Sequence, residues 1–276
     1  MEAVQIPPLE LPRPQFRAAT VGCVHPPNVD KVLALVGAGR LLDVGGWAQP
    51  LNRADCVVDL LPFETRGQYG SIGPGPERFD ASTWIEHDIC GPPLPFDDDS
   101  FDFVVCSHVL EDIRDPLRVC REMVRVGKAG YVEVPSREIE STWGVEGRYA
   151  GYYHHRWLVE LRDGGLVFRF KTPALLASRR LHLSSRHGRN MSEARRVTWL
   201  FWSGSFSYCE ELLISGVATK DELAAYVGSV DRPNRARVLL SELPRTAVEA
   251  RRVLARMRGR SPEPDEVTRL GPISLR

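Results

Sequence analysis

Hydrophobic residues along this chain gather in short runs, and several of these runs end in an acidic residue. Between residues 40 and 59 (RLLDVGGWAQPLNRADCVVD), one run ends at Asp43 and a second ends at Asp59. Two glycines, Gly45 and Gly46, follow the first acid. Short apolar runs bounded by polar residues and glycines predict buried parallel strands. The carboxyl ends of such strands form the crevice in which doubly wound sheets bind nucleotides.

Further apolar runs predict three more strands. They cover residues 84–89 (WIEHDI), with Asp88 closing the strand, residues 101–106 (FDFVVC) and residues 130–134 (GYVEV). Pro135 ends the last of them, since proline has no N–H to give to a strand ladder. Strands that alternate with helices predict a parallel sheet that is covered on both faces.

Two helices are predicted from their capping residues. Asn28 is expected to cap a helix that ends at Gly37 or Gly39, with apolar residues recurring along one face. Asp115 followed by Pro116 predicts the start of a second helix, which ends at Gly127.

The links after the first two strands differ from the usual strand–helix–strand connection. The first link, residues 47–54, is too short for a crossover that contains a helix. The second link, residues 62–83, is rich in glycine and proline and has the composition of a loop. We therefore expect these two crossover helices to be reduced or absent.

The pattern changes after Pro135. The runs at 157–161 and 166–170 flank Asp163-Gly164 and predict a β-hairpin. The remaining expectations are a loop at 136–156, an irregular basic segment at 172–195, a strand or strand pair at 199–213, and helices at 219–229 and 246–258.

Composition narrows the classes of function. The 36 Lys and Arg residues balance the 36 Asp and Glu residues, which argues against a nucleic-acid partner because such binding relies on cationic surface. The six cysteines show neither a CxxC pair nor metal-ligand spacing, so we expect reduced thiols, no bound metal and a cytoplasmic location. The first residues lack the features of a signal peptide, and no apolar run reaches the ~20 residues that span a bilayer. We therefore expect no membrane partner, and the oligomeric state is left open.

Several of these stretches together resemble the Rossmann-like S-adenosylmethionine-dependent methyltransferases. They are LLDVGG, CVVD, HDI, LPFDDDSFDFVVCSHVLEDIRDP, REMVRVGKAGYVEVPSRE and HHRWLVEL. The last two are similar to a bacterial group within the small-molecule, type-11-like branch. The resemblance covers roughly residues 28–171.

This resemblance implies an α/β fold with a mostly parallel Rossmann-like sheet, helices on both faces and a C-terminal cap. We accordingly divide the chain into an N-terminal arm (1–27), a cofactor-binding core (28–171), and a C-terminal cap and helical tail (172–276) that complete the same domain.

The resemblance also implies which residues bind S-adenosylmethionine. Asp43, Gly45 and Gly46 would line the methionine end, and Asp59 would accept hydrogen bonds from both ribose hydroxyls. At the other end, Asp88 would accept the adenine amino group, Ile89 would pack on the ring, and Ser107 and His108 would flank the sulfonium.

The first motif departs from the family pattern. Trp47 and Gln49 stand where the family normally has its second and third glycines. We include Trp47 among the cofactor-binding residues. Its indole either stacks against the ligand or obstructs the crevice, and the sequence leaves both readings open.

Three histidines are candidates for chemistry. Methyl transfer to oxygen requires a base that takes the hydroxyl proton, and histidine suits this near neutral pH. His154 and His155 form one pair of candidates, and His108 lies at the end of a strand. The alternatives are that the pair caps the hairpin and that His108 is an ordinary packing residue.

The sequence as a whole predicts a methyltransferase that acts on a small molecule, with O-methylation of a sugar or secondary metabolite resting on family analogy. The main alternative is a non-methylating protein on the same fold, such as a cyclase, an isomerase or a nucleoside-binding regulator. A methyltransferase acting on protein or RNA and an interaction module without a ligand are further alternatives.

Overall fold

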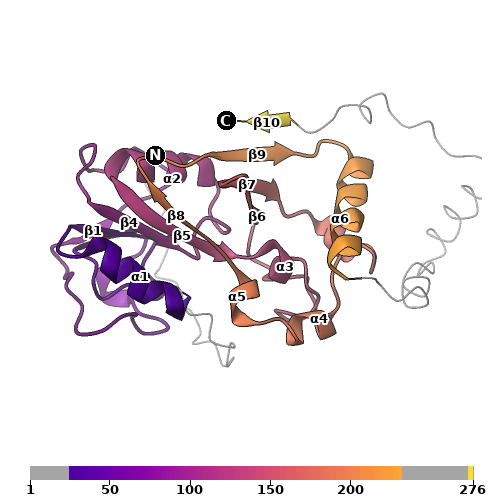
Figure 1. Cartoon of the computed structure of the whole chain (residues 1–276), viewed down its shortest axis with the longest axis horizontal. Helices are drawn as coiled ribbons and strands as arrows, with labels where there is room; N and C mark the ends of the chain where they lie inside the picture. The colour runs from indigo at the N-terminus through magenta and orange to yellow at the C-terminus, as the bar shows by residue number, and fades with distance from the viewer. Residues whose placement is uncertain (1–24, 232–272, 276) are drawn as a thin grey trace, which may run out of the picture.

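The computed structural model describes residues 25–231 and 273–275 (Figure 1). Most of the expected arm and the expected helix at 246–258 lie outside the described residues. Two sheets organise the fold. One has six strands in the order β3-β2-β1-β4-β5-β8, and the other has four in the order β10-β9-β7-β6.

The six-stranded sheet is parallel except at one edge. Its strands are β1 (Leu41–Val44), β2 (Cys56–Asp59), β3 (Trp84–Glu86), β4 (Phe103–Ser107), β5 (Ala129–Pro135) and β8 (Val197–Ser203). Leu42 pairs with Cys56 on one side of β1 and with Val104 on the other, both in parallel register. Only β8 runs antiparallel, against β5. The chain order switches at β1, and this confirms the predicted Rossmann-like α/β sheet.

Helices α1 (Pro26–Val36) and α2 (Pro116–Val126) cover opposite faces of this sheet (Figure 1). Val32 of α1 packs in a core cluster with Leu41, whereas Met123 of α2 packs in another cluster with Leu42. Since neighbouring strand residues point to opposite faces, the two helices bury the two sides of β1. The expected covering of both faces is confirmed.

The start of α1 differs from its prediction. His25 occupies the N-cap position without a side-chain hydrogen bond, and Pro26 and Pro27 form the first turn. Asn28 is therefore already helical, and its amide donates a hydrogen bond to the hydroxyl of Tyr131 at 2.8 Å. The predicted Asn28 cap is wrong because proline fits the first helical turn, where no N–H is needed.

Asp115 caps α2 as predicted, and its carboxylate accepts a hydrogen bond from the Arg118 N–H at 3.0 Å. We expect Asp115→Ala to lower the free energy of unfolding by about 1 kcal/mol, because the first turn loses that acceptor. Urea denaturation measures this change. Asp30→Ala, an exposed position within α1, is the control, and equal losses in both variants would contradict the capping role.

The links between the first strands contain almost no helix. The chain passes from β1 to β2 through turns, and the β2–β3 link holds only the short 3-10 helix η1 (Phe63–Thr65). This confirms the reduced crossovers. Gly45 opens the first turn at φ +79°, where a Cβ would also lie 2.4 Å from the Val109 side chain. Only glycine fits this position without strain.

The second sheet contains the predicted hairpin. Strands β6 (Trp157–Arg162) and β7 (Gly165–Phe170) pair antiparallel around Asp163-Gly164, both of which have positive φ. Strand β9 (Tyr208–Leu212) runs parallel to β7, and β10 (Ile273–Leu275) runs antiparallel to β9. The segment 199–213 thus forms two strands as one reading allowed, but β8 and β9 belong to different sheets.

Several of the remaining helices lie in segments that were expected to be loops. They are α3 (Arg137–Glu140), η2 (Pro173–Leu176), α4 (Ser185–Arg189), α5 (Glu193–Arg196) and α6 (Gly216–Val230). Helix α6 confirms the helix expected at 219–229. The short helices α3 and α4 fall in segments predicted to be irregular, where the side chains of Ser136 and Ser184 cap them.

Strand β3 ends at Glu86, two residues before Asp88, so Asp88 follows the strand instead of closing it. Within the described residues, no helix combines the length and the apolar character needed to cross a membrane. Five cysteines are described as free thiols, and Cys23 lies outside that part of the chain.

Candidate functional site

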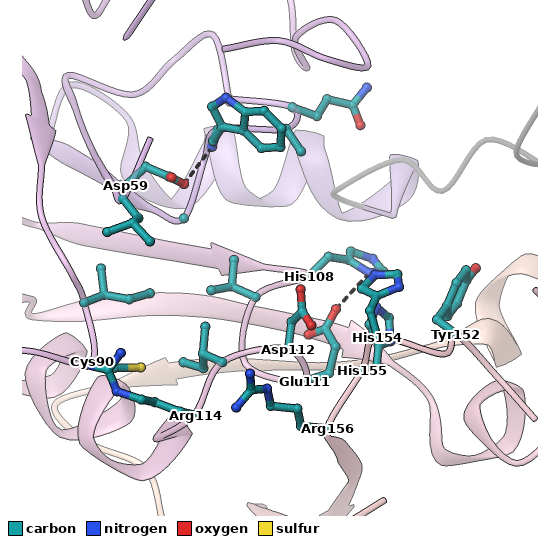
Figure 2. A pocket seen from close by; sticks show the side chains of 18 of the residues that line it. Asp59, Cys90, His108, Glu111, Asp112, Arg114, Tyr152, His154, His155 and Arg156 are labelled. Atoms are coloured by element: carbon teal, nitrogen blue, oxygen red, sulfur yellow. Dashed lines mark hydrogen bonds and ion pairs between the residues drawn. The ribbon is translucent and has the colours of Figure 1, made fainter. Parts of the chain in front are cut away.

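A pocket of about 760 Å³ opens at the carboxyl ends of β1, β2 and β4 (Figure 2). Residues from the segment before β6 line its other side. The pocket brings together eight of the predicted site residues, namely Gly45, Trp47, Asp59, Asp88, Ile89, His108, His154 and His155. Its volume is within the range of small-molecule and cofactor sites.

Three predicted site residues are not among those that line the pocket: Asp43, Gly46 and Ser107. Asp43 accepts a hydrogen bond from the Leu51 N–H at 2.9 Å, and burial raises the pKa of its carboxyl to about 7. A Cβ on Gly46 would lie 2.6 Å from the Asp43 carboxylate. Asp43 and Gly46 therefore hold the turn behind the pocket wall, and their cofactor contacts stay a prediction.

Asp59 is nearly buried at the end of β2, with 9% of its surface exposed. Its two carboxylate oxygens accept hydrogen bonds from the Leu61 and Trp47 N–H groups, each at 3.0 Å. Burial raises the pKa of this carboxyl, and the backbone donors oppose the shift. Each oxygen keeps a second lone pair, so the fixed carboxylate can still accept hydroxyl donors from the pocket.

Trp47 lies in the wall of the pocket. Its backbone N–H donates to Asp59, and its indole Nε1–H donates to the Thr65 hydroxyl at 2.9 Å. The indole is thus held by the loop that follows β2, beside a pocket that is still open. Of the two readings left open by the sequence, the geometry favours a ring that flanks a ligand.

Asp88 accepts two hydrogen bonds at the pocket. The Cys90 N–H donates to one carboxylate oxygen at 3.0 Å, and Arg114 donates to the other at 2.6 Å. The bond from Arg114 lowers the pKa of this carboxyl, so Asp88 is charged at neutral pH. Ile89, which is 8% exposed, follows it in the same wall and offers an apolar surface.

His108 stands between two buried glutamates. Its Nε2 lies 3.1 Å from a carboxylate oxygen of Glu133, and its Nδ1 lies 3.6 Å from Glu111. Burial lowers the pKa of His108, but the two carboxylates outweigh it and raise the pKa to about 9. The imidazole is thus protonated at neutral pH and has no vacant nitrogen to accept a proton. This opposes a role as general base and favours an electrostatic one.

This ion cluster predicts a pH dependence of stability. The folded state holds the His108 proton more tightly than the unfolded chain, whose histidine pKa is about 6.5. The resulting stabilisation is complete below about pH 6.5 and is lost as the pH rises through about 9. We expect the free energy of unfolding, measured with urea, to fall over this window and to fall less in His108→Asn. An equal fall in both proteins would contradict the assignment.

His155 has the geometry of a general base. Its Nδ1 lies 2.8 Å from the carboxylate of Glu140, which is fully buried and also accepts a hydrogen bond from Lys171. Burial lowers the pKa of His155, but the bond and charge of Glu140 raise it above its ordinary value. A carboxylate on Nδ1 fixes the tautomer with the proton there and leaves Nε2 to accept a proton.

His154 is more exposed than its neighbour, with 46% of its side chain accessible, and its Nδ1 lies 3.5 Å from Glu146. Figure 2 shows both histidines on the same side of the pocket as Glu111 and Asp112. The exposed ring lacks a buried orienting carboxylate. Of the three candidate histidines, His155 is the one that the structure equips for proton transfer.

Sequence reasoning missed several residues that line the pocket, namely Glu111, Asp112, Arg114 and Arg156. The first three lie in the VLEDIRD stretch directly after β4, where the chain turns over the sheet edge. Their position after a central strand was a usable signal. Among the described residues, no group of three or more potential ligands is arranged to hold a metal, and the expected absence of one stays an expectation.

One segment of the chain matches a family of known proteins. Residues 74–132 match the family described as "Methyltransferase domain". The matched segment contains β3, β4, α2 and the first part of β5, and thus Asp88, His108 and Glu111. No curated protein matched the sequence.

The solved structures that resemble this chain cover only part of it and have low TM-scores. A methyltransferase from Thermotoga maritima, described as a possible histamine N-methyltransferase, is 21% identical over 40% of this chain and 51% of that chain, with a TM-score of 0.29. An S-adenosylmethionine-dependent methyltransferase from Mesorhizobium loti is 18% identical over 52% and 63%, with a TM-score of 0.30. The [4+2]-cyclase SpnF is 18% identical over 45% and 52%, with a TM-score of 0.29.

The chain spans between half and two thirds of the length of these structures. The strand order of the six-stranded sheet, rather than these scores, carries the argument about fold. Residues 74–132 are thus similar to a methyltransferase domain, and they lie on the Rossmann-like sheet that the strand order shows.

Proposed function

We propose that this chain transfers a methyl group from S-adenosylmethionine to a hydroxyl oxygen of a small molecule, such as a sugar or secondary metabolite. The observation that carries this proposal is that Asp59 and Asp88 line the same pocket as His155, whose Nδ1 lies against the buried Glu140. One side of the pocket thus offers acceptors for a nucleoside, and the other offers a base.

The residues on the nucleoside side fit the cofactor. Asp59 is fixed by two backbone donors and retains lone pairs for a ribose diol. Asp88 is a charged acceptor near the apolar side chain of Ile89, a combination suited to an adenine amino group and ring. Trp47 adds an aromatic wall beside them.

The residues on the other side fit proton removal from an acceptor. When bound, S-adenosylmethionine supplies an electrophilic methyl group on its sulfonium. Glu140 holds the Nδ1 proton of His155, so Nε2 is available to take the hydroxyl proton as the oxygen becomes methylated. The cationic His108 lies nearby and keeps its own proton.

Calorimetric titration with S-adenosylhomocysteine tests the cofactor site, and transfer of a labelled methyl group to a panel of hydroxylated small molecules tests the reaction. We expect heat of binding and a raised melting temperature, followed by label in the acceptor. A saturating concentration of S-adenosylhomocysteine with no heat and no shift in melting temperature would overturn the proposal.

Two features favoured the alternative of a non-methylating protein on the same fold, namely Trp47 and the missing helix between β1 and β2. The hydrogen bond from the indole to Thr65 keeps the ring in the wall, and the pocket is open beside it. The missing helix removes the N–H groups that a helix start would offer to the cofactor, so it supports that alternative, whereas the geometry of Trp47 does not.

A further inference from the structure

Two adjacent carboxylates in the pocket have hydrogen-bonding capacity that the described chain does not use. Glu111 is only 1% exposed, and its Oε2 is a buried oxygen without a hydrogen-bond partner. Asp112 is exposed at the same pocket, and no residue of the described chain donates a hydrogen bond to its carboxylate. A buried carboxylate oxygen without a donor is costly, so a donor from water or from a ligand in the pocket must meet it.

His108 does not supply the missing donor to Oε2 of Glu111. Its Nδ1 lies 3.6 Å from Oε1 of Glu111, and its Nε2 lies beside Glu133. Both ring nitrogens therefore face other oxygens. Glu133 in turn also accepts from the Tyr131 hydroxyl and the His25 N–H, so it is fully paired while Glu111 is not.

The two arginines of the pocket, Arg114 and Arg156, do not supply a side-chain donor to Glu111 or Asp112 either. Arg114 donates to Asp88 at 2.6 Å. The Arg156 backbone N–H donates to the Glu111 carbonyl at 2.7 Å, and the charge of Arg156 acts on Asp112, but among the described residues its guanidinium donates to neither carboxylate. A metal ion is a poor candidate, since the described residues contain no group of three potential ligands arranged to hold one. An N–H or O–H donor on an organic ligand can meet this need by taking the place of water in the pocket.

The pair lies on the acceptor side of the pocket. Figure 2 shows Glu111 and Asp112 beside His154 and His155, with Asp59 and Cys90 on the opposite side. A donor that contacts the two carboxylates would thus belong to the molecule whose hydroxyl faces His155.

We propose that the methyl acceptor carries a protonated amine, which donates hydrogen bonds to Glu111 and Asp112 while its hydroxyl faces His155. An ammonium group supplies a positive charge and three donors, and charge-assisted hydrogen bonds to carboxylates are stronger than those from a neutral hydroxyl. This inference rests on the proposed function and narrows its substrate to amino alcohols, amino sugars or phenolic amines.

Matched pairs of probes test the inference in the presence of saturating S-adenosylhomocysteine. They are 2-amino-2-deoxyglucose against glucose, and tyramine against 4-hydroxyphenylethanol. We expect the amine of at least one pair to raise the melting temperature and to bind more tightly than its neutral partner. Asp112→Asn is expected to reduce that preference about tenfold or more, because one charge-assisted bond is weakened. Asp30→Asn, an exposed position on α1, is the control and should leave the preference unchanged.

The outcomes separate this inference from the proposed function. If S-adenosylhomocysteine binds and neutral hydroxyl compounds are methylated or bound as well as their amine partners, the amine preference is refuted while the methyltransferase activity stands. If Asp112→Asn weakens S-adenosylhomocysteine instead of the amine, or neither amine binds at millimolar concentration, the assignment is also overturned. Failure of S-adenosylhomocysteine to bind the native chain would refute the proposed function itself.

Discussion

A His155→Ala variant is expected to transfer methyl groups about 10²- to 10⁴-fold more slowly than the native chain, which is the usual contribution of a general base. The reason is geometric. His155 lines the pocket and has a buried carboxylate, Glu140, on its Nδ1. The measurement is kcat for the hydroxyl acceptor at saturating S-adenosylmethionine, with S-adenosylhomocysteine affinity measured in parallel.

His154→Ala is the matched comparison for this prediction. The two histidines are neighbours in the chain, but His154 is exposed and lacks a buried carboxylate on its ring. We expect a small change in kcat for His154→Ala and an unchanged affinity for S-adenosylhomocysteine in both variants. A large loss in His154→Ala with little loss in His155→Ala would transfer the role of base to His154.

The pH profile gives an independent check on the role of Glu140. The base must be neutral to accept a proton, so kcat/KM should rise as the pH passes upward through the pKa of His155. Burial lowers this pKa, but Glu140 outweighs it and keeps the pKa above its ordinary value. We therefore expect Glu140→Gln to move the acidic limb of the profile to lower pH. A merely structural contact would change the amplitude and leave the position of the limb where it was.

Much of the central sheet was predictable because its signals are local. Each buried strand is a short apolar run, and the acid that follows it must lie at the carboxyl edge of a parallel sheet. Asp59 and Gly45 were identified as pocket residues in this way, and the pocket contains both. The absence of a crossover helix between β1 and β2 was predictable for the same reason, because residues 47–54 are too few to contain one.

The remainder depends on contacts between segments far apart in the chain. Glu140 was not predicted as a partner of His155, because the serine cap of α3 and the turn before β6 together bring them to 2.8 Å. Likewise, His108 is protonated because two carboxylates flank its ring, and only one of them, Glu111, is close in the chain. The other, Glu133, is brought to it by the pairing of β4 with β5. The sequence left His108, His154 and His155 as candidates for chemistry, and only their tertiary contacts distinguish their roles.

The strands of 199–213 illustrate the same limit. The pattern predicts a strand or a strand pair here, and it does not show which strands they pair with. Trp202 pairs with Gly130 of β5, where a Cβ would lie 2.6 Å from the indole, whereas Tyr208 pairs with Leu166 of β7. A glycine that accommodates a large ring on the next strand selects this partner, and such complementarity is invisible without the fold.

The second large effect is expected at Asp59. Replacing it with alanine should weaken S-adenosylhomocysteine at least about 100-fold, because charge-assisted hydrogen bonds to two ribose hydroxyls are worth about 1.5–3 kcal/mol each. The same change also removes the acceptor for the Trp47 and Leu61 N–H groups, so the loop around the nucleoside loses its support. Calorimetric titration measures the affinity.

Asp59 would have two roles that a second variant can separate, namely contact with the ligand and support of the loop. Asp59→Asn retains one acceptor oxygen and the side-chain volume, so it should bind S-adenosylhomocysteine more tightly than Asp59→Ala but more weakly than the native chain. Asp97→Ala, an exposed acid outside the pocket, should bind as the native chain does. If Asp59→Ala keeps native affinity while its melting temperature falls, Asp59 only supports the loop. The nucleoside would then have to be held elsewhere in the pocket, and the reading of β2 as the ribose-binding strand would be lost.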